Sequence, residues 1–287
     1  MNPPKVWDRV VFLGTGLIGG SMAAAMRQVG LVRHLVGCGP QAFRARELEL
    51  IDEVIDDPAS AMKAADLVVL AAPPSALPEL LRQIAPVIES QTLLTDVAST
   101  KSAIIDAARQ VLGERFSRFV PAHPIAGSER HGPDAADPEL FVGARCVICP
   151  QPETDPWALQ QIEAMWSDLG ARPSRLGAVE HDEVFAAVSH LPHLVAFAVA
   201  ASLSKRPDAE SLLGWAGGGL RDTTRIAASS ATLWADILID NSAAVLTATD
   251  QFVEACSAFR VAVQAGDHAS LADQIEQAAS WRRKLHG

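Results

Sequence analysis

A glycine-rich turn near the N-terminus constrains the fold of this chain more than any other feature. The apolar run Val10–Leu13 predicts a buried parallel strand, and an apolar run typical of a helix begins at Ser21. Between them lies the pattern G-x-G-x-x-G, made of Gly14, Thr15, Gly16, Leu17, Ile18 and Gly19. A glycine triplet alone would equally mark an ordinary turn. The flanking strand and helix favour a dinucleotide-binding unit, in which backbone N–H groups and the helix dipole face the phosphates.

Composition narrows the class of protein. The 287 residues are 49% hydrophobic and 20% charged, as in globular proteins with one large domain or two. A net charge of -10 argues against a nucleic-acid partner. The first seven residues contain no apolar core of a signal peptide, and we identify no apolar run of membrane-spanning length. We therefore expect a cytoplasmic protein with neither a membrane nor a nucleic acid as partner.

The cysteines do not indicate a disulfide framework or a metal site. The chain has four, and they are scattered along the sequence. Cys146 and Cys149 stand three residues apart in a predicted strand, and no second pair accompanies them at zinc-ligand spacing. We expect buried structural thiols and no metal.

Strands and helices alternate over the first 177 residues. The predicted strands after the first are 34–38, 66–72, 92–97, 118–122, 144–149 and 173–176. Predicted helices lie at 41–50, 77–88, 99–112 and 157–169. This α/β alternation predicts a doubly wound parallel sheet, which binds its ligands at the carboxyl ends of the strands.

From about residue 178 the strand pattern disappears and helices follow one another. We expect them at 179–203, 208–216, 219–228, 231–264 and 268–285. The predicted domains are therefore 1–177 for dinucleotide binding and 178–287 for substrate binding and dimerisation. The helix 231–264 is apolar around much of its circumference and needs cover on several sides. A homodimer supplies that cover, and a self-contained bundle is the alternative.

Two side chains near predicted strand ends suit chemistry in a dehydrogenase. Ser99 follows the strand 92–97 and is either a hydrogen-bond donor to a ligand or the cap of the next helix. His123 directly follows the strand 118–122, where an imidazole that titrates near neutral pH suits a general base. A loop histidine bonded to backbone is the alternative for His123.

The helical region supplies further candidates. His190 and His193 stand three residues apart, without a third ligand at metal-binding spacing. Arg221 and Arg225 follow the glycines 217–219, and their guanidinium groups suit a carboxylate. A solvated helix face is the alternative for these arginines.

In combination these motifs resemble the prephenate/arogenate (cyclohexadienyl) dehydrogenase family of tyrosine biosynthesis. The resemblance extends in order from about residue 8 to residue 260. It rests on the glycine turn, Asp96-Val-Ala-Ser99-x-Lys101, His123-Pro-Ile-Ala-Gly-Ser-Glu129, Ser189-His190-Leu-Pro-His193 and Asp222-x-Thr-Arg225. It implies a Rossmann-like domain followed by an all-helical dimerisation domain. It also implies oxidative decarboxylation of prephenate or arogenate, with hydride transfer to NAD(P)+.

The resemblance also implies residue roles. His123 takes the proton of the ring C4 hydroxyl, Ser99 bonds to that hydroxyl, and Arg225 binds the side-chain carboxylate. Three further residues match positions that line or gate the substrate pocket: His193, Glu129 and Trp234. The chemistry requires positioning, one proton acceptor and neutralised carboxylates, without a metal.

Cofactor choice is where the sequence departs from the common NAD pattern. That pattern places an acidic residue about 20 residues beyond the glycine turn, where it accepts from the ribose 2′-hydroxyl. Here position 39 is glycine, and Arg44 or Arg46 lies within reach of a 2′-phosphate. We therefore expect NADP+ to be preferred and NAD+ to be accepted. A loosely held adenosine with NAD+ as the usual cofactor is the alternative.

Two other functions fit the domain order. One is a dehydrogenase of the β-hydroxyacid or pyrroline-carboxylate reductase kind. The β-hydroxyacid type is disfavoured because its catalytic lysine has no good counterpart, Lys205 being the only lysine between residues 102 and 283. The other is a non-catalytic dinucleotide sensor, which the presence of both His123 and Arg225 disfavours.

Overall fold

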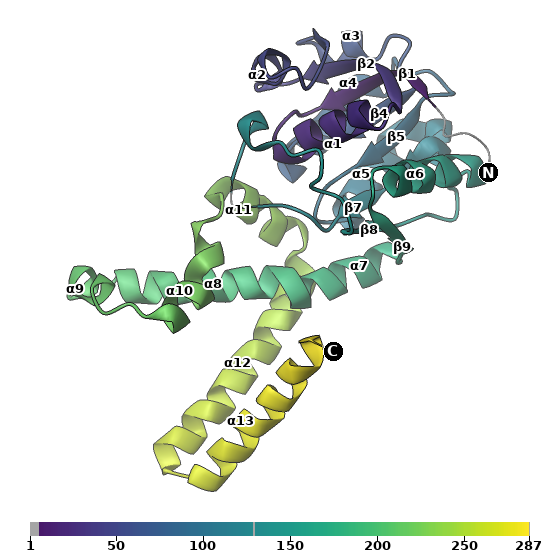
Figure 1. Cartoon of the computed structure of the whole chain (residues 1–287). Coiled ribbons are helices and arrows are strands. Elements are labelled where there is room, and N and C mark those ends of the chain that lie inside the picture. Colours follow the sequence, from purple (N-terminus) through teal and green to yellow (C-terminus); the bar gives the residue numbers. More distant parts are fainter. Residues whose placement is uncertain (1–5, 129, 287) are drawn as a thin grey trace. The chain divides into compact units, whose positions relative to one another are not determined.

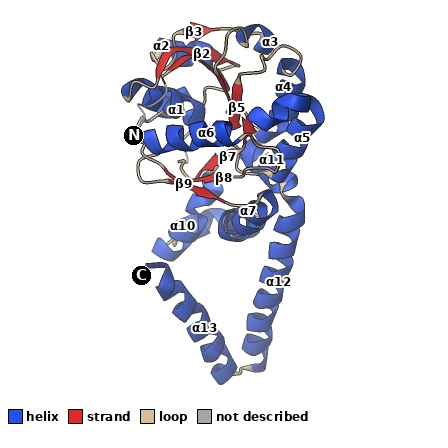
Figure 2. Cartoon of the chain, turned by 90° about the vertical axis from the view of Figure 1, so that its right-hand side faces the viewer, coloured by secondary structure: helices blue, strands red, loops and turns tan. Residues whose placement is uncertain are grey.

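The computed structural model describes residues 6–128 and 130–286, which form two compact units (Figure 1). The first unit is Met1–Asn241 and the second is Ser242–Gly287. The first contains both sheets, and the described part of the second is helical (Figure 2).

A six-stranded parallel sheet forms the centre of the first unit. Its strands are β1 (Trp7–Leu13), β2 (Val32–Cys38), β3 (Glu53–Val54), β4 (Leu67–Leu70), β5 (Leu93–Asp96) and β6 (Phe119–Val120). Their order is β3-β2-β1-β4-β5-β6, so the direction of winding reverses between β1 and β4. The predicted doubly wound parallel sheet is confirmed, and its reversal point is where such sheets bind their ligands.

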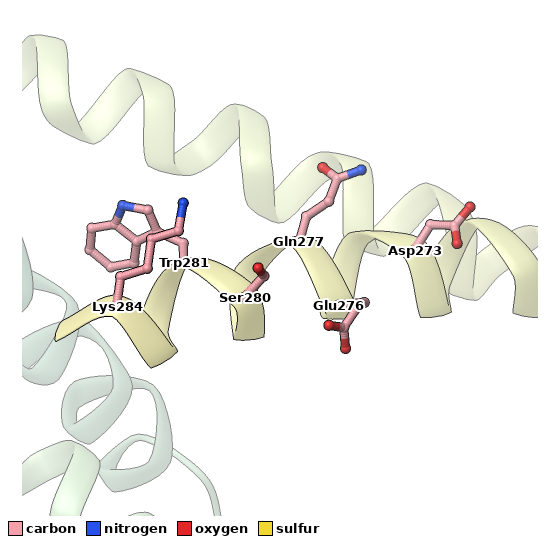
Figure 3. Close-up of a pocket in the computed structure, with 6 residues that line it drawn as sticks. All are labelled: Asp273, Glu276, Gln277, Ser280, Trp281 and Lys284. Carbon is pink, nitrogen blue, oxygen red and sulfur yellow. The ribbon is translucent and has the colours of Figure 1, made fainter. Parts of the chain in front are cut away.

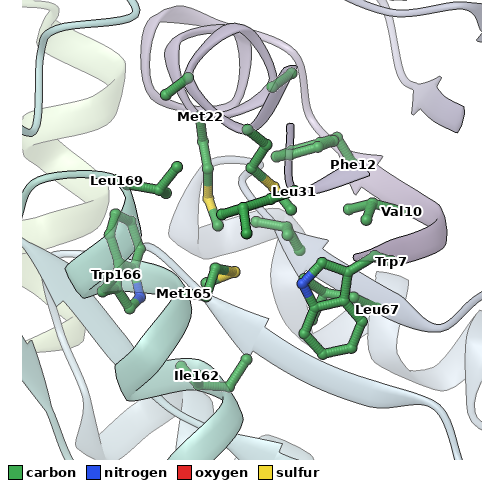
Figure 4. Close-up of a cluster of buried hydrophobic side chains, with 14 of the residues drawn as sticks. Trp7, Val10, Phe12, Met22, Leu31, Leu67, Ile162, Met165, Trp166 and Leu169 are labelled. Carbon is green, nitrogen blue, oxygen red and sulfur yellow. The ribbon is translucent and has the colours of Figure 1, made fainter. Parts of the chain in front are cut away.

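Helices cover both faces of this sheet. α1 (Leu17–Gln28), α2 (Ala42–Glu47) and α6 (Pro156–Asp168) contribute to one apolar core, whose side chains Figure 4 shows. α3 (Pro58–Ala61), α4 (Leu77–Ile84) and α5 (Ser102–Leu112) contribute to the other. Phe12 of β1 is buried in the first core and Val11 in the second, because successive strand side chains point to opposite faces. Strands buried on both faces explain the continuous apolar runs in the sequence.

The predicted strand 118–122 is wrong, because Pro121 divides it. β6 ends at Val120, and β7 (Ala122–Pro124) belongs to a second sheet of order β7-β8-β9. In that sheet β8 (Arg145–Ile148) is antiparallel to β7 and parallel to β9 (Arg172–Arg175). A proline lacks the N–H that would continue the first ladder. As a result His123 lies within β7 rather than directly after a strand.

Helices complete the first unit. They are α7 (Ala178–Phe185), α8 (Leu191–Ser204), α9 (Ala209–Leu213), α10 (Gly218–Thr224) and α11 (Ala231–Asp240). A π-helical turn, Ala186–His190, joins α7 to α8. 3₁₀ turns of this unit occur at Pro74–Ala76, Gly113–Arg118, Pro133–Ala135 and Arg225–Ala228.

One helical stretch corrects our expectation that no apolar run reaches membrane-spanning length. Ala178–Ser204 has 27 residues with a mean hydropathy of 1.8, and only 22% of its apolar window is buried. By length and composition alone it is long and apolar enough to cross a membrane. One such helix is weak evidence for a membrane protein, because helices of soluble proteins pass the same test.

The second unit is a pair of helices, α12 (Ser242–Ala265) and α13 (His268–Arg283). Asp267 caps α13, its carboxylate accepting from the Ser270 N–H at 3.0 Å. The predicted continuous helix 231–264 is wrong, because helical conformation breaks at Asn241, between α11 and α12. Many apolar side chains of α12 are exposed, including Leu246, Val253 and Val261. This exposure agrees with our expectation that the apolar surface of this helix packs against another surface.

Candidate active site

A chain of hydrogen bonds links His123 to two residues of α7. Nδ1 of His123 lies 2.8 Å from Nε2 of His181, and Nδ1 of His181 lies 2.9 Å from Oδ1 of Asp182. All three side chains are buried. The Asp182 carboxylate also accepts the backbone N–H groups of Lys101 and Ser102, each at 2.8 Å. Asp182 therefore caps the N-terminus of α5 and anchors the two imidazoles at once.

The direction of these bonds fixes the tautomer of each imidazole. An ionised carboxylate only accepts, so Nδ1 of His181 donates to Asp182 and Nε2 of His181 carries a lone pair. Nδ1 of His123 must then donate to that lone pair. Nε2 of His123 is left unprotonated, which is the form that can accept a proton.

Charge and burial hold the chain in this state. Burial raises the pKa of Asp182, but hydrogen bonds from His181, Ser102 and Lys101 outweigh it and bring the value to about 2. Burial lowers the pKa of His123 well below 6.5, and the charges of His181 and Lys101 act in the same direction. Burial likewise lowers the pKa of His181, against the raising effect of Asp182. At neutral pH the hydrogen-bonded set therefore consists of the Asp182 carboxylate and the neutral imidazoles of His181 and His123.

Asp96 at the end of β5 holds the neighbouring backbone in place. Its Oδ1 accepts the Ala122 N–H at 3.1 Å, which fixes the residue before His123. Its Oδ2 accepts the Ala98 N–H at 3.0 Å and pairs with the ammonium group of Lys101. Asp96 and Lys101 are both fully buried. This ion pair ties the strand end, the start of α5 and β7 together.

Ser99 lies half-buried between β5 and α5. Its alternative role as a helix cap does not hold, because α5 begins at Ser102 and Asp182 supplies the capping oxygens. The Ser99 hydroxyl therefore does not cap α5. Glu129 lies outside the described residues.

Three predicted substrate residues lie close together in the helical part of the first unit. The rings of His193 and Trp234 stack with their centroids 3.5 Å apart and an interplanar angle of 19°. Burial lowers the pKa of His193, a hydrogen bond to the Ser189 carbonyl opposes this, and the nearby charge of Arg225 lowers it further. The structure thus brings His193, Trp234 and Arg225 into one neighbourhood, where a cation and an aromatic face suit an anionic ring compound.

His190 lies between this neighbourhood and the hydrogen-bonded residues His123, His181 and Asp182, with its ring centroid 6.1 Å from that of Trp234. The Asn241 amide nitrogen donates to the Asp182 carbonyl at 2.7 Å and lies 3.1 Å from Nδ1 of His190. Nδ1 of His190 must accept, so its Nε2 carries the proton. That Nε2 atom is buried and has no hydrogen-bond partner among the described residues. Burial is the main cause that lowers the pKa of His190 to about 4, so at neutral pH it is an uncharged donor.

The glycine turn after β1 fits a dinucleotide. Gly14 has φ of +105°, and a Cβ there would lie 2.5 Å from the Ala71 backbone. A Cβ on Gly19 would lie 2.2 Å from the Gly14 carbonyl oxygen. These positions therefore require glycine, and the Gly14 N–H donates to the Cys38 carbonyl at 2.9 Å, which ties the turn to the end of β2. The buried Thr15 hydroxyl has no partner within the described chain, which leaves a donor for a phosphate oxygen.

The end of β2 provides no carboxylate for a ribose hydroxyl. Gly39 has φ of +121°, so an aspartate at this position would be strained. Arg44 lies nearby in α2, but its guanidinium is already paired with Asp134 and Glu47.

Other sites in the described residues offer less chemistry. No group of three or more potential metal ligands occurs there. A cavity of about 450 Å³ lies along α13 and contains none of the predicted site residues (Figure 3). A second cavity of about 230 Å³ is lined by β4–α4, α5 and the end of α11. Cys38, Cys146 and Cys149 are buried free thiols, as expected, and Cys256 is exposed.

The sequence did not indicate the residues that orient His123. His181, Asp182 and Asn241 carry no motif that separates them from ordinary helix residues. The only hint in the sequence was that His181 and Asp182 are adjacent near the start of a predicted helix. Their role depends on α7 packing near the start of α5, which is a tertiary contact.

Comparison with known proteins gives the family of the chain. The nucleotide-binding domain model of prephenate dehydrogenase matches residues 22–174, and the prephenate dehydrogenase dimerization domain model matches residues 177–277. Cyclohexadienyl dehydrogenase of Zymomonas mobilis is 32% identical over 285 residues, with 98% of this chain and 97% of the relative covered. Prephenate dehydrogenase of Bacillus subtilis is 34% identical over 290 residues, with 99% and 77% covered.

Solved structures give the same result. Prephenate dehydrogenase from A. aeolicus, in complex with hydroxyphenyl propionate and NAD+, has a TM-score of 0.90 at 29% identity, with 97% of this chain and 98% of that chain covered. Synechocystis arogenate dehydrogenase has a TM-score of 0.80 at 27% identity, with 96% and 99% covered.

The glycine turn and the doubly wound sheet, together with the two family-model matches, define an NAD(P)-dependent oxidoreductase. The matches over nearly the whole chain are more specific than this class. The chain belongs to the prephenate dehydrogenase family.

Proposed function

We propose that this chain oxidatively decarboxylates prephenate or arogenate, with His123 as the general base. The observation that carries the proposal is the Asp182–His181–His123 chain, which leaves Nε2 of a buried imidazole unprotonated. The family supports the substrate class, because its relatives are named prephenate, cyclohexadienyl and arogenate dehydrogenase.

His123 accepts the proton of the substrate's C4 hydroxyl at Nε2. As that oxygen becomes a carbonyl, the C4–H bond breaks and its electron pair leaves as hydride. A bound NAD(P)+, held at the turn Gly14–Gly19, would supply the acceptor of this hydride at its nicotinamide ring. The C1–carboxylate bond then breaks, CO2 is released, and its electron pair completes the aromatic ring. The C4 oxygen becomes a phenolate and takes the proton back from Nε2 of His123 to give the phenol. His181 and Asp182 stabilise the imidazolium formed on His123, in the manner of a catalytic triad.

The remaining predicted site residues position the substrate. Ser99 bonds to the C4 hydroxyl, and Arg225 binds the side-chain carboxylate as a bidentate partner. His193 and Trp234 form an aromatic wall beside Arg225, as their stacking supports. Glu129 is assigned to the pocket by the family motif alone.

Eight positions are assigned to the dinucleotide. Gly14, Thr15, Gly16, Leu17, Ile18 and Gly19 surround the pyrophosphate, and Gly39 borders the adenosine ribose. We propose that NADP+ is preferred and NAD+ accepted, with Arg44 facing the 2′-phosphate. Support comes from the absence of a carboxylate at position 39.

We also propose a division at Gly177, with residues 1–177 as the dinucleotide domain and 178–287 as the substrate and dimerisation domain. β9 ends at Arg175 and the two family models meet between residues 174 and 177, which supports this boundary. The exposed apolar residues of α12 and the dimerization-domain match support a homodimer. Four free cysteines support a reducing, cytoplasmic location.

His123→Asn tests the proposal. Asparagine keeps a polar side chain but accepts no proton, so kcat should fall by roughly 10²–10⁴-fold while the Kd of the cofactor stays unchanged. His34→Asn is the matched control, because His34 lies in β2 and bonds to Glu53 instead. A kcat near the wild-type value in His123→Asn would refute the assignment.

A further inference from the structure

An ion pair joins α2 to the segment that follows β7. The 3₁₀ turn Pro133–Ala135 carries Asp134, whose Oδ1 and Oδ2 accept from Nε of Arg44 at 3.0 and 3.2 Å. Nη2 of Arg44 bonds to the same carboxylate. Nη1 of Arg44 bonds to Glu47 at 3.0 Å. The Nε–Nη2 edge of Arg44, which is the edge that suits a phosphate, is therefore taken by Asp134.

Other contacts hold this segment next to the glycine turn. The Asp137 N–H donates to the Ser21 hydroxyl at 2.9 Å. A Cβ on Gly132 would lie 3.6 Å from the Gln41 amide nitrogen, and a Cβ on Gly16 would lie 3.3 Å from the Gln41 amide oxygen. Gln41 thus lies between the segment and the turn. Asp134 is held on the side of the dinucleotide site where β2 ends and the adenosine ribose binds.

We propose that Asp134 moderates the choice between NADP+ and NAD+ by competing with the 2′-phosphate for Arg44. This inference rests on the proposed dinucleotide function and on the proposed place of Arg44 in it. A phosphate dianion carries more charge than a carboxylate and accepts the same two N–H groups. With NADP+ bound, Arg44 exchanges Asp134 for the phosphate. With NAD+ bound, no such group competes and the ion pair persists.

The exposure of the pair permits this exchange. The Arg44 side chain is 49% exposed and that of Asp134 is 58% exposed. A surface ion pair of this kind is weak and screened by salt, so an incoming phosphate can replace the carboxylate. The Asp134 carboxylate still opposes NADP+, because the phosphate must displace it from Arg44. The protein consequently accepts both cofactors instead of strongly preferring NADP+.

Cofactor titrations on the whole chain test the inference without an activity assay. The Kd of NADP+ and of NAD+ should be measured by calorimetry for wild type, Asp134→Asn, Arg44→Gln and the double variant. Asp134→Asn should bind NADP+ about tenfold more tightly, a change of about 1.4 kcal/mol, with the Kd of NAD+ unchanged. Arg44→Gln should weaken NADP+ alone, and Asp134→Asn should have no effect in that background.

The matched control is Arg33→Gln, which removes an exposed, ion-paired arginine at the opposite end of β2 and should change neither Kd. The inference is overturned if Asp134→Asn changes both cofactors equally or neither, or if its effect persists without Arg44. If the proposed preference for NADP+ is wrong, the wild-type protein will show a lower Kd for NAD+ than for NADP+. In that case a change in the ratio of the two Kd values in Asp134→Asn would still support the role of Asp134.

Discussion

Replacing His181 tests whether the hydrogen-bonded chain sets the reactivity of His123. In His181→Leu the Nδ1–H of His123 loses its acceptor at 2.8 Å, in a site where both rings are buried. An unpaired buried donor costs about 1–3 kcal/mol, and the lost bond is one that strengthens when His123 becomes charged. Without it the unprotonated Nε2 tautomer is no longer favoured. We expect the transition state to lose about 2–3 kcal/mol, which lowers kcat/KM by about 30- to 150-fold.

The assay is kcat/KM from pH 5 to pH 9, measured beside the thermal midpoint of each variant. His181→Gln is the matched control, because its side-chain oxygen can accept from His123 Nδ1 and should restore most of the activity lost in His181→Leu. Wild type should lose activity only below pH 6.5, since burial lowers the pKa of His123. Equal activities of the leucine and glutamine variants, at equal stability, would show that the chain only packs the site.

Three further predictions concern binding and stability. Arg225→Ala should raise the substrate KM while the cofactor Kd stays constant, and Arg225→Lys should bring the KM only part of the way back. The control Arg221→Ala should have little effect on KM. Equal KM changes in the two alanine variants would contradict the role of Arg225. Lys101→Met should lower the free energy of unfolding in urea by about 3–5 kcal/mol, because it leaves the buried Asp96 carboxylate unpaired; a loss below about 1 kcal/mol would contradict this. Below pH 6.5 buried histidines such as His190 bind a proton in the unfolded chain but not in the folded one, so the free energy of unfolding should fall between pH 6.5 and about 4. His190 alone contributes up to about 3 kcal/mol to this fall. A free energy of unfolding that stays constant over this pH range would contradict the buried neutral state of His190.

The sequence predicted the features that depend on local pattern. The glycine turn, the alternation of strands and helices and the change near residue 178 follow from periodicity and from glycine chemistry, which neighbouring residues determine. The sequence also indicated His123 and Arg225, because each belongs to a short motif beside a predicted element. The parallel sheet and its order agree with this interpretation.

The features that it missed depend on contacts between distant segments. Strand patterns do not distinguish one sheet from two, so the transfer of β7 to a second sheet at Pro121 was not predicted. The break at Asn241 was missed because its side chain is satisfied by Asp182 and His190, which are more than 50 residues away. Arg44 was predicted to face a phosphate, and its pairing with Asp134 depends on a contact 90 residues along the chain.

The most direct test of the account is the ratio of CO2 released to NAD(P)H formed when the purified protein turns over prephenate or arogenate. The account predicts turnover of at least one of the two, with a ratio of one and with NADP+ giving the higher kcat/KM. It also predicts that His123→Asn lowers the rate of formation of both products by the same factor. A protein that binds the dinucleotide but converts neither substrate, or that reduces the cofactor without releasing CO2, would contradict the central claim.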